Sequence, residues 1–558
     1  MGNSTEHLPR SVYLEGEKLQ KFETSAGVTI QEKYGPEDLE EFDYGEHLGE
    51  PGQYPFTRGV YPNMYRGRMW TRRFQVGFGT PDDVRERLKY LYGEGQTGFT
   101  LTIDLPTSYG FDSDETIAEG EVGVTGVAIS TLDDLETIFS DYPPTEVSCS
   151  LSVRPPVSAV FLAMLDAMAD KRGLEKAKVL GTIQNDPIFQ MSGGPLQTTT
   201  QFFPLEGIIR LSVDVIEHAS LHFPKLNWLV CNGYNARDTG IDAVQEIAFS
   251  LALAVDVFER VLQRGLDIDQ FAPRAAWLMA VGMNMFEEAA KFRAMRRMWA
   301  RIVKERFGAK DPRSMKLRVA IQNSGTSYTT QQPLNNIIRG TAGVIGAVLS
   351  GVQSFQVASY DEGLCLPTPE SSRIALRTSQ IIGYETDITY TVDPLAGSYF
   401  VESLTNEMEA RIAAYLEKIE KKGGLLEAAK SGWLENEIVQ ARVANQKALE
   451  SGEKIRVGVN RFTIPEEEEP EITLSRIKTE EWEEKRKAYL KRWRSERNAQ
   501  ETEAALETVR WAMKTDRNMI PVLSMALQAG ATHGELHRAM RAGLKETDSR
   551  ERDNHDAD

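Results

Sequence analysis

Rows of small polar side chains are the part of this sequence best suited to binding chemistry. The rows contain Ser148, Ser150 and Ser152 in one run, Thr100 and Thr102 in an earlier run, and Arg318 and Gln322 in a later run. Side chains two positions apart point to the same face of a β-strand. Their hydroxyl, amide and guanidinium groups can hydrogen-bond a long polar ligand, whereas they provide no thiol nucleophile or imidazole base.

Histidine and cysteine chemistry is not favoured by the pattern. His218 and His222 have helical i, i+4 spacing, but no Glu follows the first His as in the metalloprotease motif, so we expect an exposed helix face. Cys149, Cys231 and Cys365 are too few and too scattered for a disulfide framework or a metal cluster. We therefore expect no metal site and no histidine-driven acid–base chemistry.

The composition is that of a globular protein with an acidic balance. The 558 residues include 64 Lys and Arg against 82 Asp and Glu, which gives a net charge of −18. This balance argues against nucleic acid or an anionic membrane as a partner. The N-terminal residues lack the apolar stretch of a signal peptide, and the longest apolar run is too short to span a bilayer. We predict a cytoplasmic protein with no membrane partner.

The elements that must position the polar rows are predicted between residues 70 and 360, where strand-like and helical runs alternate. The strand candidates are 72–78, 98–104, 146–153, 178–185, 227–233, 276–282, 316–323 and 354–359. Helical stretches lie between them, such as 81–95 and 287–308. Eight strands that alternate with helices are typical of a (β/α)8 barrel.

The alternation within the strands predicts a polar interior. In the run 146–153, Val147, Cys149 and Leu151 oppose the three serines. Helices cover the outside of such a barrel, so the apolar face points outward and the polar face inward. Buried hydroxyls need hydrogen-bond partners, so the axis should hold water or a slender polar ligand. The alternative is an open sheet with a solvated edge, or the opposite assignment of the two faces.

The predicted organisation has five parts. They are an N-terminal arm (1–45), the α/β barrel (46–400), a helical extension (401–463), an acidic linker (464–477) and a charged helical C-terminal region (478–558). The linker contains the run IPEEEEPEI, which is typical of a solvated segment.

Several blocks of sequence, in register, resemble the methylmalonyl-CoA mutase family. They include GVYPNMYRGRMWTRRFQVGF, VLGTIQND, NGYNARDTG, FAPRAAWLMAVGMNMFEEAAKFRAMRRMWA and VDPLAGSYFVE, and they run from about residue 48 to 463. Weaker similarity continues to about residue 540. The family fold is a (β/α)8 barrel whose axis holds the CoA tail, which agrees with the polar interior inferred from the strands.

The resemblance implies a radical carbon-skeleton rearrangement of an acyl-CoA with adenosylcobalamin as cofactor. The family's cobalt-binding motif is D-x-H-x-x-G, and ATHGELHRAM around His533 and His537 does not match it. The cobalamin should therefore be carried mainly by a cobalamin-binding small subunit. Further partners that the resemblance implies are a GTPase chaperone and a second copy of each subunit in a heterotetramer.

The resemblance also assigns roles to individual residues. The implied substrate-binding residues are Tyr61, Met64, Arg68, Thr71, Arg73, Thr100, Ser148, Ser150, Ser152, Arg274 and Arg318, with Arg68 and Arg73 suited to phosphates. The implied cofactor contacts are Ile103, Leu105, Asp238, Gln322 and Glu362. Asn63 and Ala358 depart from the family's usual Thr and Asn, and Ala358 suggests fewer contacts to the adenosyl group.

Three departures concern the acyl group itself. Gln75 and Asn235 replace a Tyr and a His of the family, and we predict them as the catalytic positions. The family's carboxylate-binding Arg falls in a segment that has gained about four residues, where Gln197 or Thr198 is nearest. We therefore expect a branched or hydroxylated acyl-CoA without a free carboxylate, of the isobutyryl or 2-hydroxyisobutyryl type.

Two other functions remain open from the sequence. One is a catalytically silent CoA-binding barrel with a scaffold or regulatory role, which the altered His, Tyr and Arg positions favour. The other is an unrelated barrel enzyme such as an aldolase, but the strand runs offer no plausible Schiff-base Lys. The active mutase is preferred because Arg68, Gln322, Glu362 and the serine row are retained.

Overall fold

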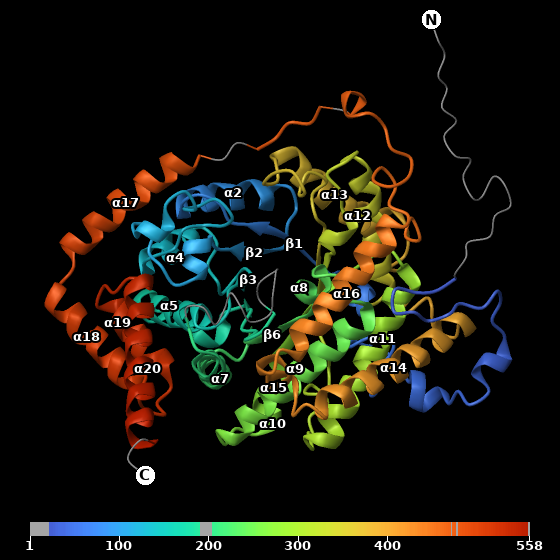
Figure 1. The fold of residues 1–558 in the computed structure, drawn as a ribbon, viewed down its shortest axis with the longest axis horizontal. Helices are drawn as coiled ribbons and strands as arrows, with labels where there is room; N and C mark the ends of the chain where they lie inside the picture. Colours follow the sequence, from blue (N-terminus) through green and yellow to red (C-terminus); the bar gives the residue numbers. More distant parts are fainter. Residues whose placement is uncertain (1–21, 190–202, 470, 476–477, 556–558) are drawn as a thin grey trace, which may run out of the picture.

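The core of the computed structural model is a parallel sheet that closes into a barrel (Figure 1). The structure describes residues 22–189, 203–469, 471–475 and 478–555. The strands are β1 Thr71–Val76, β2 Gly98–Thr102, β3 Cys149–Ser152, β4 Gly181–Ile183, β5 Leu226–Asn227, β6 Leu229–Asn232, β7 Ala275–Val281, β8 Val319–Asn323 and β9 Ser354–Gln356. Their order is β5-β4-β3-β2-β1-β9-β8-β7-β6. Only Trp228 separates β5 from β6, so the two edges of the sheet meet and the predicted barrel is confirmed.

Each of the eight predicted strand runs contains a strand, and the fifth is divided. In that run, Asn227 pairs with Thr182 of β4, whereas Leu229 pairs with Ala275 of β7. The break at Trp228, which is fully buried, lets one run of sequence serve both neighbours.

Helices cover the outside of the barrel. The longer ones are α2 Pro81–Gly93, α4 Leu132–Ile138, α5 Val157–Arg172, α7 Leu205–His222, α9 Ala243–Gln263, α11 Met285–Arg301, α12 Asn335–Leu349 and α13 Pro369–Glu385. Short helices α1 Met64–Gly67, α3 Leu105–Ser108, α8 Gly233–Asp238 and α10 Ile268–Phe271 lie in the connecting segments. Helix α5 is buried on all sides from Val157 to Ala169, which fits a stretch whose polar residues are Ser158 and Asp166 alone.

Further helices flank the barrel on two sides (Figure 1). Helices α14 Tyr399–Glu420, α15 Leu425–Lys430 and α16 Trp433–Glu450 lie on one side, where α14 packs on α9 and α11. Helices α17 Thr479–Glu496, α18 Ala499–Ala512, α19 Met519–Gln528 and α20 His533–His555 lie on the other side, where α19 packs on α5. The segment between α16 and α17 crosses from one side to the other.

The expectation of an exposed face for His218 was wrong. His218 is buried, and its Nε2 lies 3.1 Å from Oδ1 of Asp166 on α5, while His222 is exposed. Ser524 of α19 donates to the other oxygen of Asp166 at 3.0 Å. A helix some 300 residues later in the chain therefore covers this part of α7, which a local pattern could not reveal.

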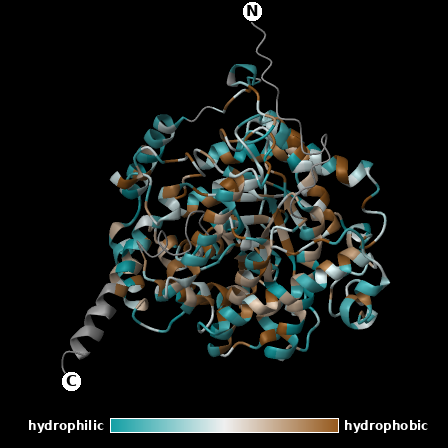
Figure 2. Cartoon of the chain, turned by 45° about the vertical axis from the view of Figure 1, so that its right-hand side comes forward, coloured by the Kyte–Doolittle hydropathy of each residue, from teal (hydrophilic) through white to brown (hydrophobic). Residues whose placement is uncertain are grey.

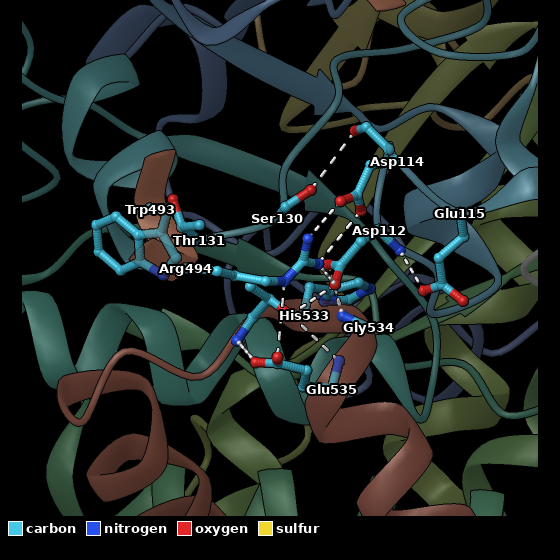
Figure 3. A network of polar contacts seen from close by, with 12 residues as sticks. Asp112, Asp114, Glu115, Ser130, Thr131, Trp493, Arg494, His533, Gly534 and Glu535 are labelled. Carbon is cyan, nitrogen blue, oxygen red and sulfur yellow. Dashed lines mark hydrogen bonds and ion pairs between the residues drawn. The ribbon is translucent and has the colours of Figure 1, made fainter. Parts of the chain in front are cut away.

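Buried ion pairs attach the C-terminal helices to the barrel. Arg486 of α17 donates to both carboxylate oxygens of Asp134 at 2.7 and 2.6 Å, and both side chains are buried. Figure 3 shows Arg494 of α17 between Asp112, Asp114 and Glu535. These contacts make α17–α20 (residues 479–555) part of the same folded body as the barrel.

The outer helices are amphipathic. Hydrophilic and hydrophobic residues alternate along them (Figure 2). Their apolar faces join one large core that runs from the strands to the C-terminal helices. Among the described residues, no helix has the length and apolar character needed to cross a membrane.

Candidate active site

The barrel axis holds a cavity of about 280 Å³. The polar residues that line it are Tyr61, Thr71, Arg73, Gln75, Thr100, Ser148, Ser150, Ser152, Thr182, Gln184, Asn227, Asn232, Tyr234, Asn235, Arg274, Arg318, Gln322, Gln353, Ser354 and Gln356. The other face of the strands is apolar, as with Cys149 and Leu151 on β3, which are buried in the core. The expected polar interior is therefore confirmed.

Asp104 belongs to the polar face of its run but serves the fold. Its carboxylate accepts from the backbone N–H of Thr107 at 3.0 Å and of Gly123 at 2.9 Å. These bonds cap α3 and hold the loop that follows it. Burial raises the pKa of Asp104 to about 6 despite these hydrogen bonds.

A second cavity, of about 420 Å³, leads into the axis from the N-terminal end of the strands. Its lining runs from Tyr61 to Thr71 and includes the predicted CoA contacts Met64 and Arg68. Tyr61, Thr71 and Gln353 line both cavities, so the two are adjoining. The structure thus brings together four of the residues predicted for the CoA end.

Arg73 has a different setting from the one expected of a phosphate ligand. Its guanidinium donates to the carbonyl of Phe99 at 2.9 Å, to Oγ of Ser148 at 2.7 Å and to Oγ of Ser354 at 3.2 Å. Those acceptors belong to β2, β9 and the residue before β3. Arg73 therefore ties strand ends together, and most of its donors are used within the protein.

Arg274 and Arg318 carry positive charge at the N-terminal end of the axial cavity. Arg274 directly precedes β7, and Arg318 directly precedes β8. Burial, followed by a smaller effect of the Arg274 charge, lowers the pKa of Arg318 to about 10. Its Nη2 donates to the carbonyl of Pro273, while its buried Nε has no partner among the described residues. A free buried donor on a cavity wall suits an anionic or carbonyl-rich ligand.

An amide ladder was missed in the sequence-based site. Gln184 donates to Oγ of Ser150 at 3.3 Å, and its Oε1 lies 3.5 Å from the hydroxyl of Ser152. Asn227 donates to Oγ1 of Thr182 at 3.3 Å. The alternation rule that selected the serines also places Thr182 and Gln184 inward, so the same signal could have found both.

Neutral amides gather at the C-terminal end of the cavity. They are Gln75, Gln184, Asn232, Asn235, Gln322 and Gln356. Asn235 is held there because the side chain of Asn232 caps α8 and accepts from the backbone N–H of Asn235 at 3.0 Å. The two predicted catalytic residues, Gln75 and Asn235, therefore line one cavity with Gln322.

Two carboxyl groups lie near this end. Asp238 accepts from Oγ of Ser324 at 2.7 Å and from the backbone N–H of Gly325 at 3.1 Å, and burial raises its pKa. Glu362 is partly exposed. Desolvation by the neighbouring protein, reinforced by the charges of Asp238 and Asp361, raises its pKa to about 7. Glu362 can therefore both accept and donate a hydrogen bond near neutral pH.

Of the four remaining predicted residues, the structure describes Ile103 and Leu105. Ile103 follows β2 and is buried, and Leu105 is the first residue of α3, so both lie beyond the C-terminal end of that strand. Gln197 and Thr198 lie outside the described residues.

Comparison with known proteins agrees with this architecture. The methylmalonyl-CoA mutase family model matches residues 23–546. The 2-hydroxyisobutanoyl-CoA mutase large subunit of Aquincola tertiaricarbonis is 37% identical over 521 residues, which cover 93% of this chain and 91% of that protein. A probable mitochondrial methylmalonyl-CoA mutase of Caenorhabditis elegans is 36% identical over 93% of this chain and 68% of its own length. The methylmalonyl-CoA mutase of Escherichia coli is 34% identical over 93% of this chain and 71% of its own length.

These matches span the barrel, the axial cavity and the C-terminal helices together. The relatives are acyl-CoA mutases, which are isomerases, and they include proteins that are named for different acyl groups. The chain belongs to the methylmalonyl-CoA mutase family.

Proposed function

We propose that this chain is the substrate-binding subunit of an adenosylcobalamin-dependent mutase that rearranges a branched or hydroxylated acyl-CoA without a free carboxylate. CoA enters at the N-terminal end of the barrel, its pantetheine follows the axis, and the acyl group reaches the C-terminal end.

The distribution of charge along the axis carries this proposal. The charged residues that line the axial cavity are Arg73, Arg274 and Arg318, and all three belong to its N-terminal end. The C-terminal end is lined by amides, with the carboxyl groups of Asp238 and Glu362 beyond them. None of the described residues that line this end is a cation, so a carboxylate enclosed there would face two acidic groups, which is unfavourable in a poorly hydrated site.

Two parts of the chain that follow barrel strands in the sequence are possible sources of a cation: the segment 190–202 and Arg154. The segment 190–202 reads QMSGGPLQTTTQF and contains no Lys, Arg or His. Arg154 follows β3, but its guanidinium stacks on Tyr109 at 4.8 Å from the ring centroid and donates to the carbonyl of Ser108 at 3.3 Å. These contacts hold Arg154 beside α3, although its buried Nη1 has no hydrogen-bond partner among the described residues.

The neutral side chains define the proposed roles. Asn235 would donate a hydrogen bond to the thioester oxygen, and Gln75 would accept from or donate to a hydroxyl on the acyl group. Ser150 and Ser152, joined by Gln184, would face the pantetheine amides. Amides at these positions orient the substrate without moving a proton, so the chain's own contribution is placement and exclusion of water.

The residues at the C-terminal end fit the adenosyl part of the cofactor. Gln322 lines the cavity there, and the Glu362 carboxyl can pair with ribose hydroxyls in either protonation state. Ile103 and Leu105 offer apolar contact beside them. When bound, adenosylcobalamin supplies the radical chemistry, and the protein holds the reacting groups in a closed space.

A cobalamin-binding partner would cover this end of the barrel. The similar protein of Aquincola tertiaricarbonis is named as a large subunit. In this chain, Ile338 of α12 is 69% exposed and Phe462 is 55% exposed. Gln332 links the two regions by donating to the carbonyl of Phe462 at 3.0 Å. These apolar side chains could pack against such a partner.

The test supplies the chain with a cobalamin-binding small subunit and adenosylcobalamin. Turnover of 2-hydroxyisobutyryl-CoA, isobutyryl-CoA and methylmalonyl-CoA is then compared at equal concentrations. We expect an uncharged acyl-CoA to be converted at least tenfold faster than methylmalonyl-CoA. Efficient conversion of methylmalonyl-CoA would contradict the proposal.

The silent CoA-binding subunit is the second candidate, because Gln75 and Asn235 cannot reproduce a phenol and an imidazole. Binding of CoA by the chain without turnover of any acyl-CoA, in the presence of partner and cofactor, would favour it. The GTPase chaperone, the heterotetramer and the cytoplasmic location stay predictions from the sequence.

A further inference from the structure

One side-chain amide at the C-terminal end of the axial cavity has its orientation fixed by the fold. Asn232 is the last residue of β6 and the N-cap of α8, and its Oδ1 accepts from the backbone N–H of Asn235 at 3.0 Å. The capping atom must be the oxygen, because only an acceptor can pair with a backbone N–H. The amide nitrogen Nδ2 of Asn232 therefore occupies the other position.

The backbone of Asn232 is held in place as well. Its N–H donates to the buried carboxylate of Asp186 at 2.7 Å, and the same carboxylate accepts from the N–H groups of Ile188 and Phe189 at 2.7 and 2.8 Å. The next residue, Gly233, lies so close to β7 that an added Cβ would be 2.6 Å from the methyl carbon of Met279. Asn232 is therefore fixed both at its backbone and at its side chain.

The Nδ2 group of Asn232 is a donor that the fold does not use. Asn232 is 2% exposed and lines the axial cavity, and no described residue accepts a hydrogen bond from its Nδ2. Within the described ranges, the amides of Gln75 and Gln322 in the same cavity also make no hydrogen bond to the protein, so either end of those two amides can face a ligand. A buried donor without a partner is unfavourable, and a ligand that accepts from it removes this cost.

We propose that Asn232 is a further substrate-binding residue, whose Nδ2 donates a hydrogen bond to an oxygen of the acyl group. This inference rests on the proposed function, because it takes the acyl group of an acyl-CoA to lie at the C-terminal end of the axis. Two acyl oxygens have the required chemistry: the thioester carbonyl and, in a hydroxyacyl-CoA, the hydroxyl. An amide donor serves either oxygen without bringing a charge into the cavity.

The experiment titrates the full-length chain with 2-hydroxyisobutyryl-CoA, isobutyryl-CoA and CoA by calorimetry, without adenosylcobalamin, so that no acyl group is rearranged. Asn232→Ser and Asn232→Asp both remove Nδ2, and both keep an oxygen that can cap α8. Asn284→Ser is the matched control. Asn284 caps α11 after β7 in the same way, by accepting from the N–H of Glu287 at 3.3 Å, but it does not line the axial cavity.

We expect Asn232→Ser to bind at least one acyl-CoA about three- to tenfold more weakly, which is the loss of one neutral hydrogen bond, and to bind CoA as wild type does. Asn232→Asp should lose at least as much, because it places an acceptor opposite the acyl oxygen. Asn284→Ser should match wild type for all three ligands. Equal losses with both acyl-CoAs identify the thioester carbonyl as the partner of Nδ2, and a loss confined to the hydroxyacyl-CoA identifies the hydroxyl.

Two results would overturn the inference alone. One is unchanged affinity of both Asn232 variants for both acyl-CoAs, which would refute the contact while the proposed function stands. The other is equal weakening of CoA and the acyl-CoAs, which would show that Asn232 acts only through the cap of α8. Failure of the wild-type chain to bind CoA or either acyl-CoA would refute both this inference and the proposed function.

Discussion

Two regions of the molecule use their basic side chains in opposite ways. In the C-terminal helices α17–α20, Arg486, Arg494 and Arg497 each meet carboxylates, as Figure 3 shows for Arg494. At the barrel entrance, Arg68 has no carboxylate within 4.0 Å among the described residues. Both regions contain cationic side chains. Those of Arg486, Arg494 and Arg497 are paired with carboxylates of the protein, whereas that of Arg68 is unpaired in the part of the chain that the structure describes.

The difference distinguishes cations that hold the fold together from cations that are available to bind a ligand. A paired and buried guanidinium joins two segments of the chain, so its removal costs stability. An unpaired cation beside a cavity contributes little to the fold, so its removal should cost ligand affinity. The comparison therefore assigns a separate measurement to each region.

The largest effect should come from the paired region. Arg486→Ala leaves the buried Asp134 carboxylate without its partner, and breaking such a pair costs about 3–5 kcal/mol. We expect a clearly lower urea midpoint of unfolding and an unchanged CoA affinity in the fraction that remains folded. A variant with wild-type stability would show that this ion pair does not hold α17 to the barrel.

Arg68→Ala should show the opposite behaviour. Loss of a charge-assisted phosphate contact is worth about 1.5–3 kcal/mol of binding, so the Michaelis constant for any acyl-CoA should rise tenfold or more. Stability should stay within about 0.5 kcal/mol, because Arg68 is exposed. Unchanged affinity for every acyl-CoA would contradict the threading of CoA through this entrance.

A pH effect of similar or smaller size should arise at the junction of α20 with the barrel. His533 Nε2 donates to the carbonyl of Thr107 at 2.8 Å, and burial lowers the pKa of His533 to about 4. The unfolded chain, with an ordinary histidine pKa near 6.5, then binds more protons between pH 6.5 and 4. The contribution of His533 to stability should therefore fall as pH drops through this window, by about 2 kcal/mol between pH 7 and 5.

His533→Gln isolates this contribution. The amide can still donate to Thr107 but does not titrate, so its loss of stability between pH 7 and 5 should be smaller than that of wild type. Asp112, whose pKa burial raises to about 6, acts in the opposite direction and is present in both proteins. If the urea midpoint changes by the same amount between pH 7 and pH 5 in wild type and in His533→Gln, His533 has no role in the pH dependence.

The smallest effect should come from an ion pair at the surface. Arg306 pairs with Glu420 and with Glu259 at 2.7 Å, and all three side chains are substantially exposed. Such pairs contribute about 0–1 kcal/mol, so Arg306→Ala should change neither stability nor CoA affinity beyond that range. A larger loss of stability would show that pairing alone, without burial, decides the cost.

The barrel and its polar axis could be predicted because both depend on local periodicity. Alternating serines in the run 146–153 fixed which face of β3 points inward. The same rule could have found Thr182 and Gln184. The division of the fifth run at Trp228 could not be predicted, because it depends on closure of the sheet.

The settings of single charges were harder to predict. The type of Arg73 suggested a phosphate ligand, but its donors meet Phe99, Ser148 and Ser354, which come together only in the closed barrel. His218 was expected to be exposed, but α19 lies over that side of the molecule and its Ser524 meets Asp166. In both cases the partner comes from a distant part of the sequence.

The most direct test is a structure of the chain with a bound acyl-CoA. We expect the pantetheine along the axis beside Ser150 and Gln184, the nucleotide beside Arg68, and the acyl group near Gln75 and Asn235. A competing cavity of about 450 Å³ lies outside the barrel between α9, α11 and α14. Acyl-CoA bound in that outer cavity, with the barrel axis free of ligand, would contradict the account.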